Sequence, residues 1–292
     1  MIMLKYVLFV LLFIALCAAY GFLRFKKITD GYKVAFSGNE GKGTEIIREE
    51  VLVDGCLGKV YGILQMPKSK DRMTLIIMSH GFGSRHEHTS PYGAYLAREG
   101  FATYCYSFGG GSRGKSRSDG TMLQMSVLTE AEDLCAVIDH FKKDERFDKI
   151  VLFGQSQGGF VSAYVAGKRP DDIAALLMEY PALVIQDDAK KRMNSDGTFP
   201  ETSNIMGAKI SKKYNEDALS FDIYDVIKGF KKEVLIIHGD EDQIVPLSYS
   251  QRAQEVYDNC KLIVLSGQNH GFMGDGLKKA MEYELEFFNR YR

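Results

Sequence analysis

The stretch IVLFGQSQGGFVSAYVA at residues 150–166 decides the fold. It opens with a short apolar run, which is typical of a buried parallel strand, and it ends in small residues that favour a helix. Between these parts, Gly154 and Gly158 flank Ser156 in a Gly-x-Ser-x-Gly pattern. Such glycines let a strand and a helix approach closely, so that the serine hydroxyl is exposed on a tight, strained turn. An incidental serine in a Gly-rich turn is the alternative, but the strand–turn–helix context favours a nucleophile.

Length and charge narrow the class of protein. A chain of 292 residues is long enough for one large α/β domain with a sizeable core. It carries 37 basic and 38 acidic residues, a net charge of −1, so nothing in this balance indicates a surface for nucleic acid. The five cysteines are widely spaced without a CxxC pair, and they predict neither a disulfide framework nor a structural zinc site.

Residues 1–25 are expected to form a signal sequence or a membrane anchor. Within them, the uncharged run YVLFVLLFIALCAAYGFL at 6–23 is just long enough to span a bilayer as a helix. Small residues at 17–19 offer a site where a signal peptidase could cut. If the segment is retained, the basic residues within 24–27 favour a catalytic domain on the cytoplasmic side, whereas cleavage favours export. The sequence leaves the orientation open.

The rest of the chain alternates predicted strands and helices. Residues 26–49 are polar and Gly-rich and are expected to form a linker, and the folded domain is placed at 50–292. An antiparallel hairpin is predicted at 50–65. The alternation predicts a mostly parallel central sheet flanked by helices. The further predicted strands lie at 74–79, 101–106, 150–153, 173–179, 234–237 and 262–265, and predicted helices lie at 91–99 and 127–142.

A glycine-containing loop, HGFG at 80–83, follows the strand predicted at 74–79. In a sheet of this kind, the loop after a central strand can supply a backbone N–H to an oxyanion hole. We expect this N–H from Phe82 and a second one from Gln157, the residue after the expected nucleophile. Each such donor lowers the barrier of the reaction by roughly 3 kcal/mol.

Three histidines in this region raise the alternative of a metal site. His80, His86 and His88 lack a carboxylate or a cysteine at helical spacing, so the sequence does not favour metal binding. His80 is expected to shape the loop, and the other two histidines are expected to be solvated.

Residues 109–116, GGGSRGKS, match the phosphate-binding pattern GxxxxGK[ST] in full. A phosphate-binding loop of this type continues directly into a helix whose N-terminus faces the phosphates. Here the chain continues with polar, turn-forming residues, and Gly120 would break such a helix. The segment is therefore predicted to be an exposed Gly/Ser loop beside an active site rather than a nucleotide site.

Residues 182–230 interrupt the alternation of strands and helices. They are rich in charge and contain a loop at 194–200. An insertion of this length between core strands is more often a lid or a substrate cap than a separate domain. We expect a cap, and a surface excursion without a role in specificity is the alternative.

Two acids and one histidine follow the last predicted strands. Asp240 and Asp242 come after the strand at 234–237, where an acidic side chain can reach the carboxyl edge of the sheet. Asp242 is preferred as the acid that orients a histidine, and Asp240 is expected to shape the turn. His270 lies in a Gly-flanked loop after the strand at 262–265 and is expected to be the catalytic base.

Four motifs follow one another along the chain: HGF at 80–82, GQSQG at 154–158, GDEDQIVP at 239–246 and NHGF at 269–272. With Ser156, Asp242 and His270 in this order, the chain resembles the α/β-hydrolase superfamily over roughly residues 50–292. Within that superfamily, it is similar to the bacterial cinnamoyl/feruloyl esterases and their acyl-peptidase-like relatives. This closer similarity rests on GQSQGG, on DGTMLQMSVLTEAED at 119–133 and on the insertion.

The resemblance implies an α/β-hydrolase fold with a cap, a carboxylic ester as the small-molecule substrate and no cofactor. It also implies that Ser156, His270 and Asp242 act as a triad that forms an acyl-enzyme, with Phe82 and Gln157 as the oxyanion hole. A serine peptidase of acylaminoacyl type on the same scaffold is the alternative, and a membrane-tethered binding protein without catalysis is a more distant one. The oligomeric state and the acyl and alcohol specificity stay open.

Overall fold

A computed structural model of the chain describes residues 45–69 and 71–292. The hydrophobic run at 6–23 lies outside these residues, so its role as a signal or an anchor stays a prediction. Within the described ranges, no helix is both long and apolar enough to cross a membrane.

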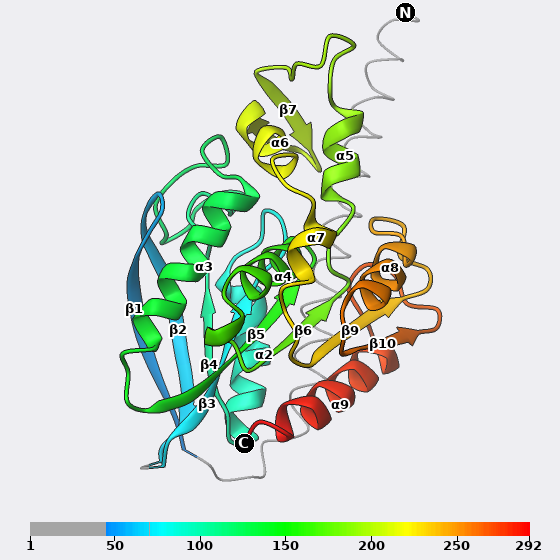
Figure 1. Ribbon diagram of the computed structural model, residues 1–292. Helices are drawn as coiled ribbons and strands as arrows, with labels where there is room; N and C mark the ends of the chain where they lie inside the picture. Colours follow the sequence, from blue (N-terminus) through cyan, green and yellow to red (C-terminus); the bar gives the residue numbers. More distant parts are fainter. Residues whose placement is uncertain (1–44, 70) are drawn as a thin grey trace, which may run out of the picture.

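An eight-stranded sheet forms the centre of the described chain (Figure 1). Its strands are Ile46–Gly55 (β1), Gly58–Pro67 (β2), Met73–Ser79 (β3), Ala102–Tyr106 (β4), Phe147–Gln155 (β5), Ala175–Glu179 (β6), Val234–Gly239 (β9) and Cys260–Leu265 (β10). They lie in the order β1-β2-β4-β3-β5-β6-β9-β10. The β1–β2 and β2–β4 pairs are antiparallel, and the other pairs are parallel. The predicted mostly parallel sheet is therefore confirmed.

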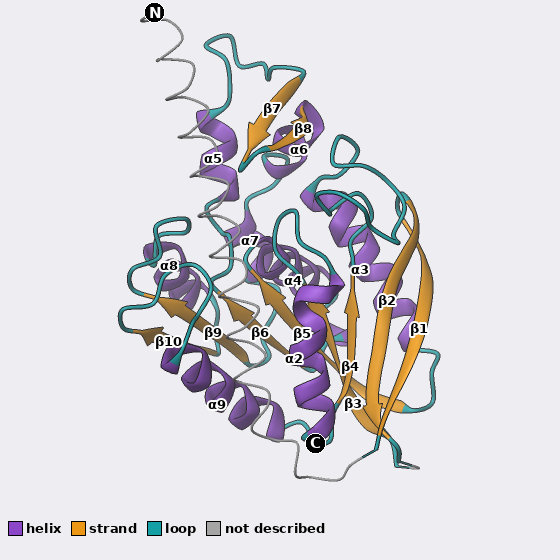
Figure 2. Ribbon diagram, turned by 180° about the vertical axis from the view of Figure 1, so that it is seen from behind, coloured by secondary structure: helices purple, strands orange, loops and turns teal. Residues whose placement is uncertain are grey.

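Helices cover both faces of this sheet. On the face shown in Figure 1 lie Val127–Phe141 (α3), Gln157–Lys168 (α4) and Ser248–Val256 (α8). The opposite face, which Figure 2 brings to the front, is covered by His86–Arg98 (α2) and Asp275–Asn289 (α9). A short 3₁₀ helix, Pro170–Asp172 (η1), lies between α4 and β6.

The central strands are buried on both faces, as their continuous apolar runs predict. In β3, Leu75 and Ile77 belong to the core cluster beneath α3 and α4, whereas Ile76 and Met78 belong to the cluster beneath α2 and α9. All of these side chains are fully buried. Because side chains alternate between the faces of a strand, one apolar run supplies both layers of the core.

The predicted hairpin at the edge of the sheet is confirmed, since β1 and β2 pair along their whole length. β1 begins at Ile46, inside the stretch 26–49 that was expected to be linker, so the folded domain starts before residue 50. Arg146, next to the start of β5, forms an ion pair with Glu49 of β1 at 2.9 Å. This long-range contact helps to attach the early part of the strand to the domain.

Helix α2 begins earlier than predicted. It starts at His86 and continues through Pro91, which lies inside the helix. The backbone N–H of His86 donates to Ser107 Oγ at 3.0 Å, so a residue distant in sequence fixes the first turn. The sequence around Pro91, from which the start of the helix was predicted, gives no sign of this contact with Ser107.

The segment 109–116, which matches the phosphate-binding pattern, forms a loop that does not continue into a helix. Its first amide binds the protein itself, because the N–H of Gly109 donates to Asp133 Oδ2 at 2.7 Å. Residues 109–112 are buried and residues 113–117 are exposed. The prediction that this loop is exposed is therefore confirmed for its second half. It is wrong for its first half, which is buried against α3.

Residues 185–218 of the insertion at 182–230 lie beyond the carboxyl ends of the parallel strands (Figure 1), whereas residues 223–227 pack against α4. It contains Ile185–Lys191 (α5), the hairpin strands Thr202–Ile205 (β7) and Ala208–Ser211 (β8), Lys212–Ala218 (α6) and Ile223–Ile227 (α7). Arg113 of the Gly-rich loop donates from Nη1 to Met206 O, in the turn between β7 and β8, at 2.5 Å. This bond ties the tip of the insertion to the body of the domain.

Two carboxyl groups face each other inside the domain, Glu179 at the end of β6 and Glu284 on α9, and both are buried. Gln155 Nε2 donates to Glu179 Oε2 at 2.6 Å, and the hydroxyl of Tyr92 donates to Glu284. Burial raises the pKa of both groups, and the nearby Glu179 raises the pKa of Glu284 further. We therefore expect the pair to retain a proton at neutral pH.

Replacing Glu284 with glutamine is expected to stabilise the protein at alkaline pH. A carboxyl group whose pKa is raised on folding stabilises the protein below its unfolded pKa, and this contribution is lost as the pH rises through the folded pKa. Glutamine can still accept the Tyr92 hydroxyl but cannot ionise. The melting temperature of Glu284→Gln should exceed that of the wild type at about pH 9, and the gain should shrink at about pH 5. Glu282→Gln, an exposed change on the same helix, is the control, and a gain confined to pH 5 would contradict the assignment.

Candidate active site

Ser156 lies on a strained turn at the end of β5. The strand ends at Gln155 and α4 starts at Gln157, and Ser156 between them has φ 53° and ψ −119°. A positive φ is unfavourable for a residue with a Cβ, so the surrounding structure must impose it. The N–H of Ser156 donates to Glu179 O on the neighbouring strand at 3.0 Å, which helps to fix the turn. The predicted strand–turn–helix geometry is confirmed.

The close approach of β5, α4 and β3 at this turn requires glycine at positions 154 and 158. A Cβ on Gly154 would lie 2.4 Å from Gly158 O, and a Cβ on Gly158 would lie 2.3 Å from Ser79 O. Both distances are far below van der Waals contact, so a larger residue at either position would push α4 away from the sheet. The two glycines thus bring β3, β5 and α4 together around the serine.

Three side chains predicted to act together meet at the carboxyl ends of the parallel strands. His270 Nε2 lies 2.9 Å from Ser156 Oγ, and His270 Nδ1 lies 2.7 Å from Asp242 Oδ2. Because these residues follow β5, β9 and β10, the sheet gathers groups that are distant in sequence at one edge. The His270 ring also packs against the ring of Tyr180, with centroids 4.6 Å apart.

Asp242 is held as an ionised acceptor. Its Oδ1 accepts the N–H groups of Ile244 and Val245 at 2.8 and 2.9 Å. Its Oδ2 lies 3.2 Å from His238 Nε2, in addition to its contact with His270. Burial alone would raise the pKa of Asp242, but the hydrogen bonds from His238, His270 and Val245 hold that pKa well below its usual range. The carboxylate can therefore orient the His270 ring over the whole neutral range of pH.

Asp240 and His238 have different places around this acid. Asp240 Oδ1 accepts the N–H of Gly267 at 2.7 Å and shapes the turn, so the structure brings Asp242 rather than Asp240 to His270. His238 is buried at the end of β9, and its Nδ1 lies 2.7 Å from Ser250 Oγ. Sequence reasoning missed His238; its position at the end of an apolar strand, close to the two acids, was the available signal.

Phe82 and Gln157 lie beside Ser156, and all three line one pocket. A Cβ on Gly81 would lie only 3.1 Å from Ser156 Cβ, so the backbone of the HGFG loop runs directly against the serine. Within the described chain, neither the N–H of Phe82 nor that of Gln157 donates to another protein group. Two backbone donors next to the serine hydroxyl are thus available to bind an oxygen atom.

His80 fixes the HGFG loop from within the domain. Its Nδ1 lies 2.8 Å from Gly81 O, and its Nε2 accepts the N–H of Phe108 at 3.1 Å. Burial lowers the pKa of His80 to about 4, so the ring is neutral at pH 7. Because Nε2 is the acceptor, Nδ1 carries the proton and donates to Gly81 O. His80 therefore shapes the loop, as predicted.

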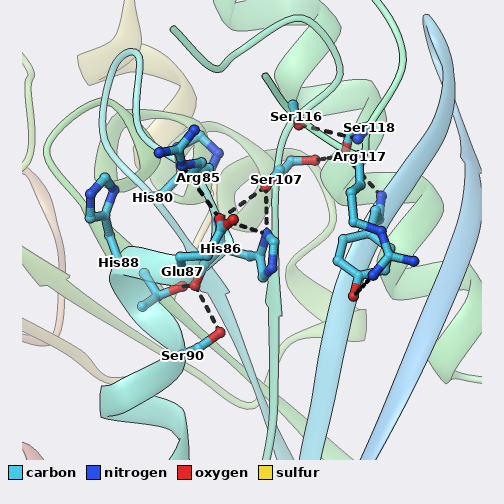
Figure 3. Close-up of polar contacts among 12 residues, drawn as sticks. His80, Arg85, His86, Glu87, His88, Ser90, Ser107, Ser116, Arg117 and Ser118 are labelled. Atoms are coloured by element: carbon cyan, nitrogen blue, oxygen red, sulfur yellow. Dashed lines mark hydrogen bonds and ion pairs between the residues drawn. The ribbon is translucent and has the colours of Figure 1, made fainter. Parts of the chain in front are cut away.

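His86 and His88 are less solvated than predicted. Figure 3 shows His86 beside Ser107, and His86 Nδ1 lies 3.0 Å from Ser107 Oγ. His86 is buried and His88 is half-buried, because the early start of α2 places both against neighbouring loops. Within residues 45–69 and 71–292, no group of three or more His, Cys, Asp or Glu side chains is arranged to hold a metal ion.

The side chain of Gln157 connects the elbow to the cap. It is buried; its Nε2 donates to Glu130 Oε2 at 2.8 Å, and its Oε1 accepts the hydroxyl of Tyr214 at 2.6 Å. The ring of Tyr214 also meets the ring of Phe82 edge to face, with centroids 6.1 Å apart. One residue of the cap therefore contacts both residues whose N–H groups flank Ser156. Sequence reasoning missed Glu130 and Tyr214, since they lie on α3 and α6 and no local pattern pairs them with Gln157.

A pocket lies between the cap and Ser156. Its wall is mostly apolar and includes Phe82, Val184, Ile185, Ile205, Met206 and Ile244, and its charged residues are Asp188 and Arg192. Much of this wall belongs to the insertion, which favours its interpretation as a cap over that of a surface excursion.

Known sequences match a large part of this chain. The sequence model of the family described as Serine aminopeptidase, S33, matches residues 70–221. The alpha/beta hydrolase domain-containing protein WAV2 of Arabidopsis thaliana is 31% identical over 137 residues, which are 46% of this chain and 42% of that protein. The chain thus spans less than half of WAV2. The bifunctional esterase/perhydrolase DCH of Acinetobacter calcoaceticus is 24% identical, and the match covers 68% of this chain and 85% of that enzyme.

Among solved structures, Est1E from Butyrivibrio proteoclasticus, determined with bound ferulic acid, is similar over most of the chain. The two proteins are 28% identical with a TM-score of 0.72. The match covers 81% of this chain and 98% of Est1E. The sheet, its flanking helices and this similarity show the α/β-hydrolase fold.

Proposed function

Because the chain belongs to the serine aminopeptidase S33 family of α/β hydrolases, we propose that it is a serine hydrolase that cleaves carboxylic esters. The observation that carries this proposal is the series Ser156–His270–Asp242, joined by contacts of 2.9 and 2.7 Å. The description of DCH as an esterase, and the carboxylic acid bound to Est1E, support an ester as the substrate.

The first chemical step forms an acyl-enzyme. His270 Nε2 takes the proton of Ser156 Oγ as this oxygen attacks the ester carbonyl, and Asp242 keeps the other ring proton on Nδ1. The carbonyl oxygen becomes negative between the N–H groups of Phe82 and Gln157, each of which stabilises it by roughly 3 kcal/mol. His270 then gives its proton to the leaving alcohol, and the acyl group stays on Ser156.

The second step releases the acid. His270 takes a proton from water while the water oxygen attacks the acyl carbonyl, and the same two N–H groups bind the new oxyanion. The bond to Ser156 Oγ then breaks, and His270 returns a proton to that oxygen. Neither step requires a cofactor.

A serine peptidase is the second candidate, because the description of the matching family names aminopeptidase activity. The acylaminoacyl type is the form of this alternative that the sequence resemblance implies. Such an enzyme needs polar groups that bind a peptide terminus close to the nucleophile. Apart from Asp188 and Arg192, the wall of the pocket around Ser156 is mostly apolar, which supports an ester whose acyl chain is apolar next to the reacting carbonyl.

A matched substrate pair separates these candidates. The purified full-length chain would be given p-nitrophenyl acyl esters and aminoacyl p-nitroanilides, with Ser156→Ala as the background. We expect ester turnover and no anilide turnover above that background. Because an amide is intrinsically harder to cleave than an ester, anilide turnover as fast as ester turnover would overturn the ester proposal in favour of the peptidase.

Replacing Tyr214 with phenylalanine is expected to lower kcat about 10-fold, with a smaller change in KM. The variant keeps the ring against Phe82 but removes the donor to Gln157 Oε1, a contact that helps to position the residue whose backbone N–H flanks Ser156. Steady-state ester hydrolysis measures the change. Tyr224→Phe is the matched control, because that cap hydroxyl donates to Tyr249 O at 3.2 Å, outside the Gln157 contact. A Tyr214→Phe enzyme with the kcat of the wild type would show that the hydroxyl does not position the site.

A further inference from the structure

Arg192 is the one cation among the described residues that line the pocket above Ser156. It follows the end of α5, in the cap, and its side chain is half-buried. The walls around it are mostly apolar. A charged group in such surroundings loses part of its hydration, which is unfavourable unless another charge or hydrogen-bonding group replaces the water.

The other charges of α5 are already paired within the helix. Lys190 Nζ lies 3.0 Å from Asp187 Oδ1, and Lys191 Nζ lies 2.8 Å from Asp188 Oδ1. Asp188 also lines the pocket, but Lys191 offsets its charge. Among these five charged residues of the α5 region, Arg192 alone has no carboxylate within ion-pair distance in the described part of the chain, and the charge of Asp188 acts on it only from farther away.

The guanidinium of Arg192 is anchored through one nitrogen. Its Nε donates to Asn215 Oδ1 at 2.8 Å, and this contact fixes the Arg192 side chain to α6, another helix of the cap. In the described residues, its Nη1 and Nη2 form no hydrogen bond or ion pair with the protein. Burial lowers the pKa of Arg192, but an arginine stays protonated at neutral pH. The pocket therefore presents a fixed, charged pair of donors that a planar anion can bind in bidentate form.

We propose that Arg192 binds a carboxylate at the far end of the acyl group, so that the preferred substrates are esters of dicarboxylic acids with one free carboxylate. This proposal rests on the function proposed above. Ser156 and Gln157 line the same pocket as Arg192, and the acyl group is the part of the substrate that stays on Ser156 in the acyl-enzyme. The apolar walls contact the methylene chain, and Arg192 binds the charged end.

Two esters of equal chain length test the subsite in the full-length protein. One is p-nitrophenyl hexanoate and the other is the mono-p-nitrophenyl ester of adipic acid, which carries a carboxylate where the first has a methyl group. The wild type is expected to prefer the adipate ester in kcat/KM by about 10-fold or more, the usual scale of one charged hydrogen-bonding contact. Arg192→Met should abolish this preference, and Arg192→Lys, which keeps the charge without the planar fork, should retain part of it.

Lys190→Met is the matched control. It removes the same charge two positions before Arg192, at an exposed position outside the pocket, so it should leave the ratio of the two kcat/KM values as in the wild type. Melting curves establish that each variant is folded. A wild type that cleaves hexanoate without preferring adipate, or an Arg192→Met variant that keeps the preference, would overturn the subsite while the proposed esterase stands. Failure of the folded wild type to cleave either ester would count against the esterase itself.

Discussion

Ser156→Ala and His270→Ala are each expected to lower kcat for ester hydrolysis by about 10⁴- to 10⁶-fold while the fold stays intact. The first change removes the atom that carries the acyl group, and the second removes the base 2.9 Å from that atom. Because the two residues act as one unit, the double variant should be no worse than the single ones. The residual rate measures what the oxyanion donors and substrate binding provide alone.

Matched controls separate this result from a general loss of structure. Ser162→Ala changes a buried serine of α4 whose hydroxyl has no hydrogen-bond partner in the described chain, and His140→Ala changes an exposed histidine of α3. Both controls should keep the kcat of the wild type. If Ser156→Ala retained more than about one hundredth of the wild-type kcat, far above the usual effect of losing a nucleophile, the assignment would be wrong.

Asp242→Asn is expected to lower kcat by about 10⁴-fold. An asparagine at this position can donate from its amide to His270 Nδ1, which would place the ring proton on Nε2, where the base needs a free lone pair. The carboxylate that stabilises the charged ring is lost at the same time. Ester hydrolysis at several pH values measures the effect.

Asp240→Asn provides the comparison for this prediction. Asp240 accepts the N–H of Gly267, and asparagine can still accept it through its amide oxygen, so the variant should stay within a few-fold of the wild type. A larger loss in Asp240→Asn than in Asp242→Asn would reverse the two roles.

Much of the fold follows from patterns that the sequence displays locally. The apolar runs of the central strands are long enough to identify strands buried on both faces, and the glycines at 154 and 158 mark the turn around Ser156. The order of Ser156, Asp242 and His270 then indicates which loops meet, because parallel strands end at one edge of the sheet. For these residues, local pattern and topology point to the same site.

Features that depend on long-range partners could not be predicted in this way. The start of α2 depends on Ser107, and the burial of His86 follows from it. The side chain of Gln157 is bound by Glu130 and Tyr214, which lie 27 and 57 positions away on other helices. Such contacts depend on how the helices pack against the sheet. The sequence around a hydrogen-bonding side chain shows no periodic pattern that identifies its partner.

Labelling of the folded, full-length chain with a fluorophosphonate tests the central claim most directly. Such a reagent transfers its phosphonyl group to the oxygen of an activated serine and releases fluoride, so it reports the nucleophile without any choice of ester. Intact mass and peptide mapping should show one label, on Ser156, in the wild type and no label in Ser156→Ala or His270→Ala. A folded wild type that stays unlabelled, or a Ser156→Ala protein labelled as fully as the wild type, would contradict the account.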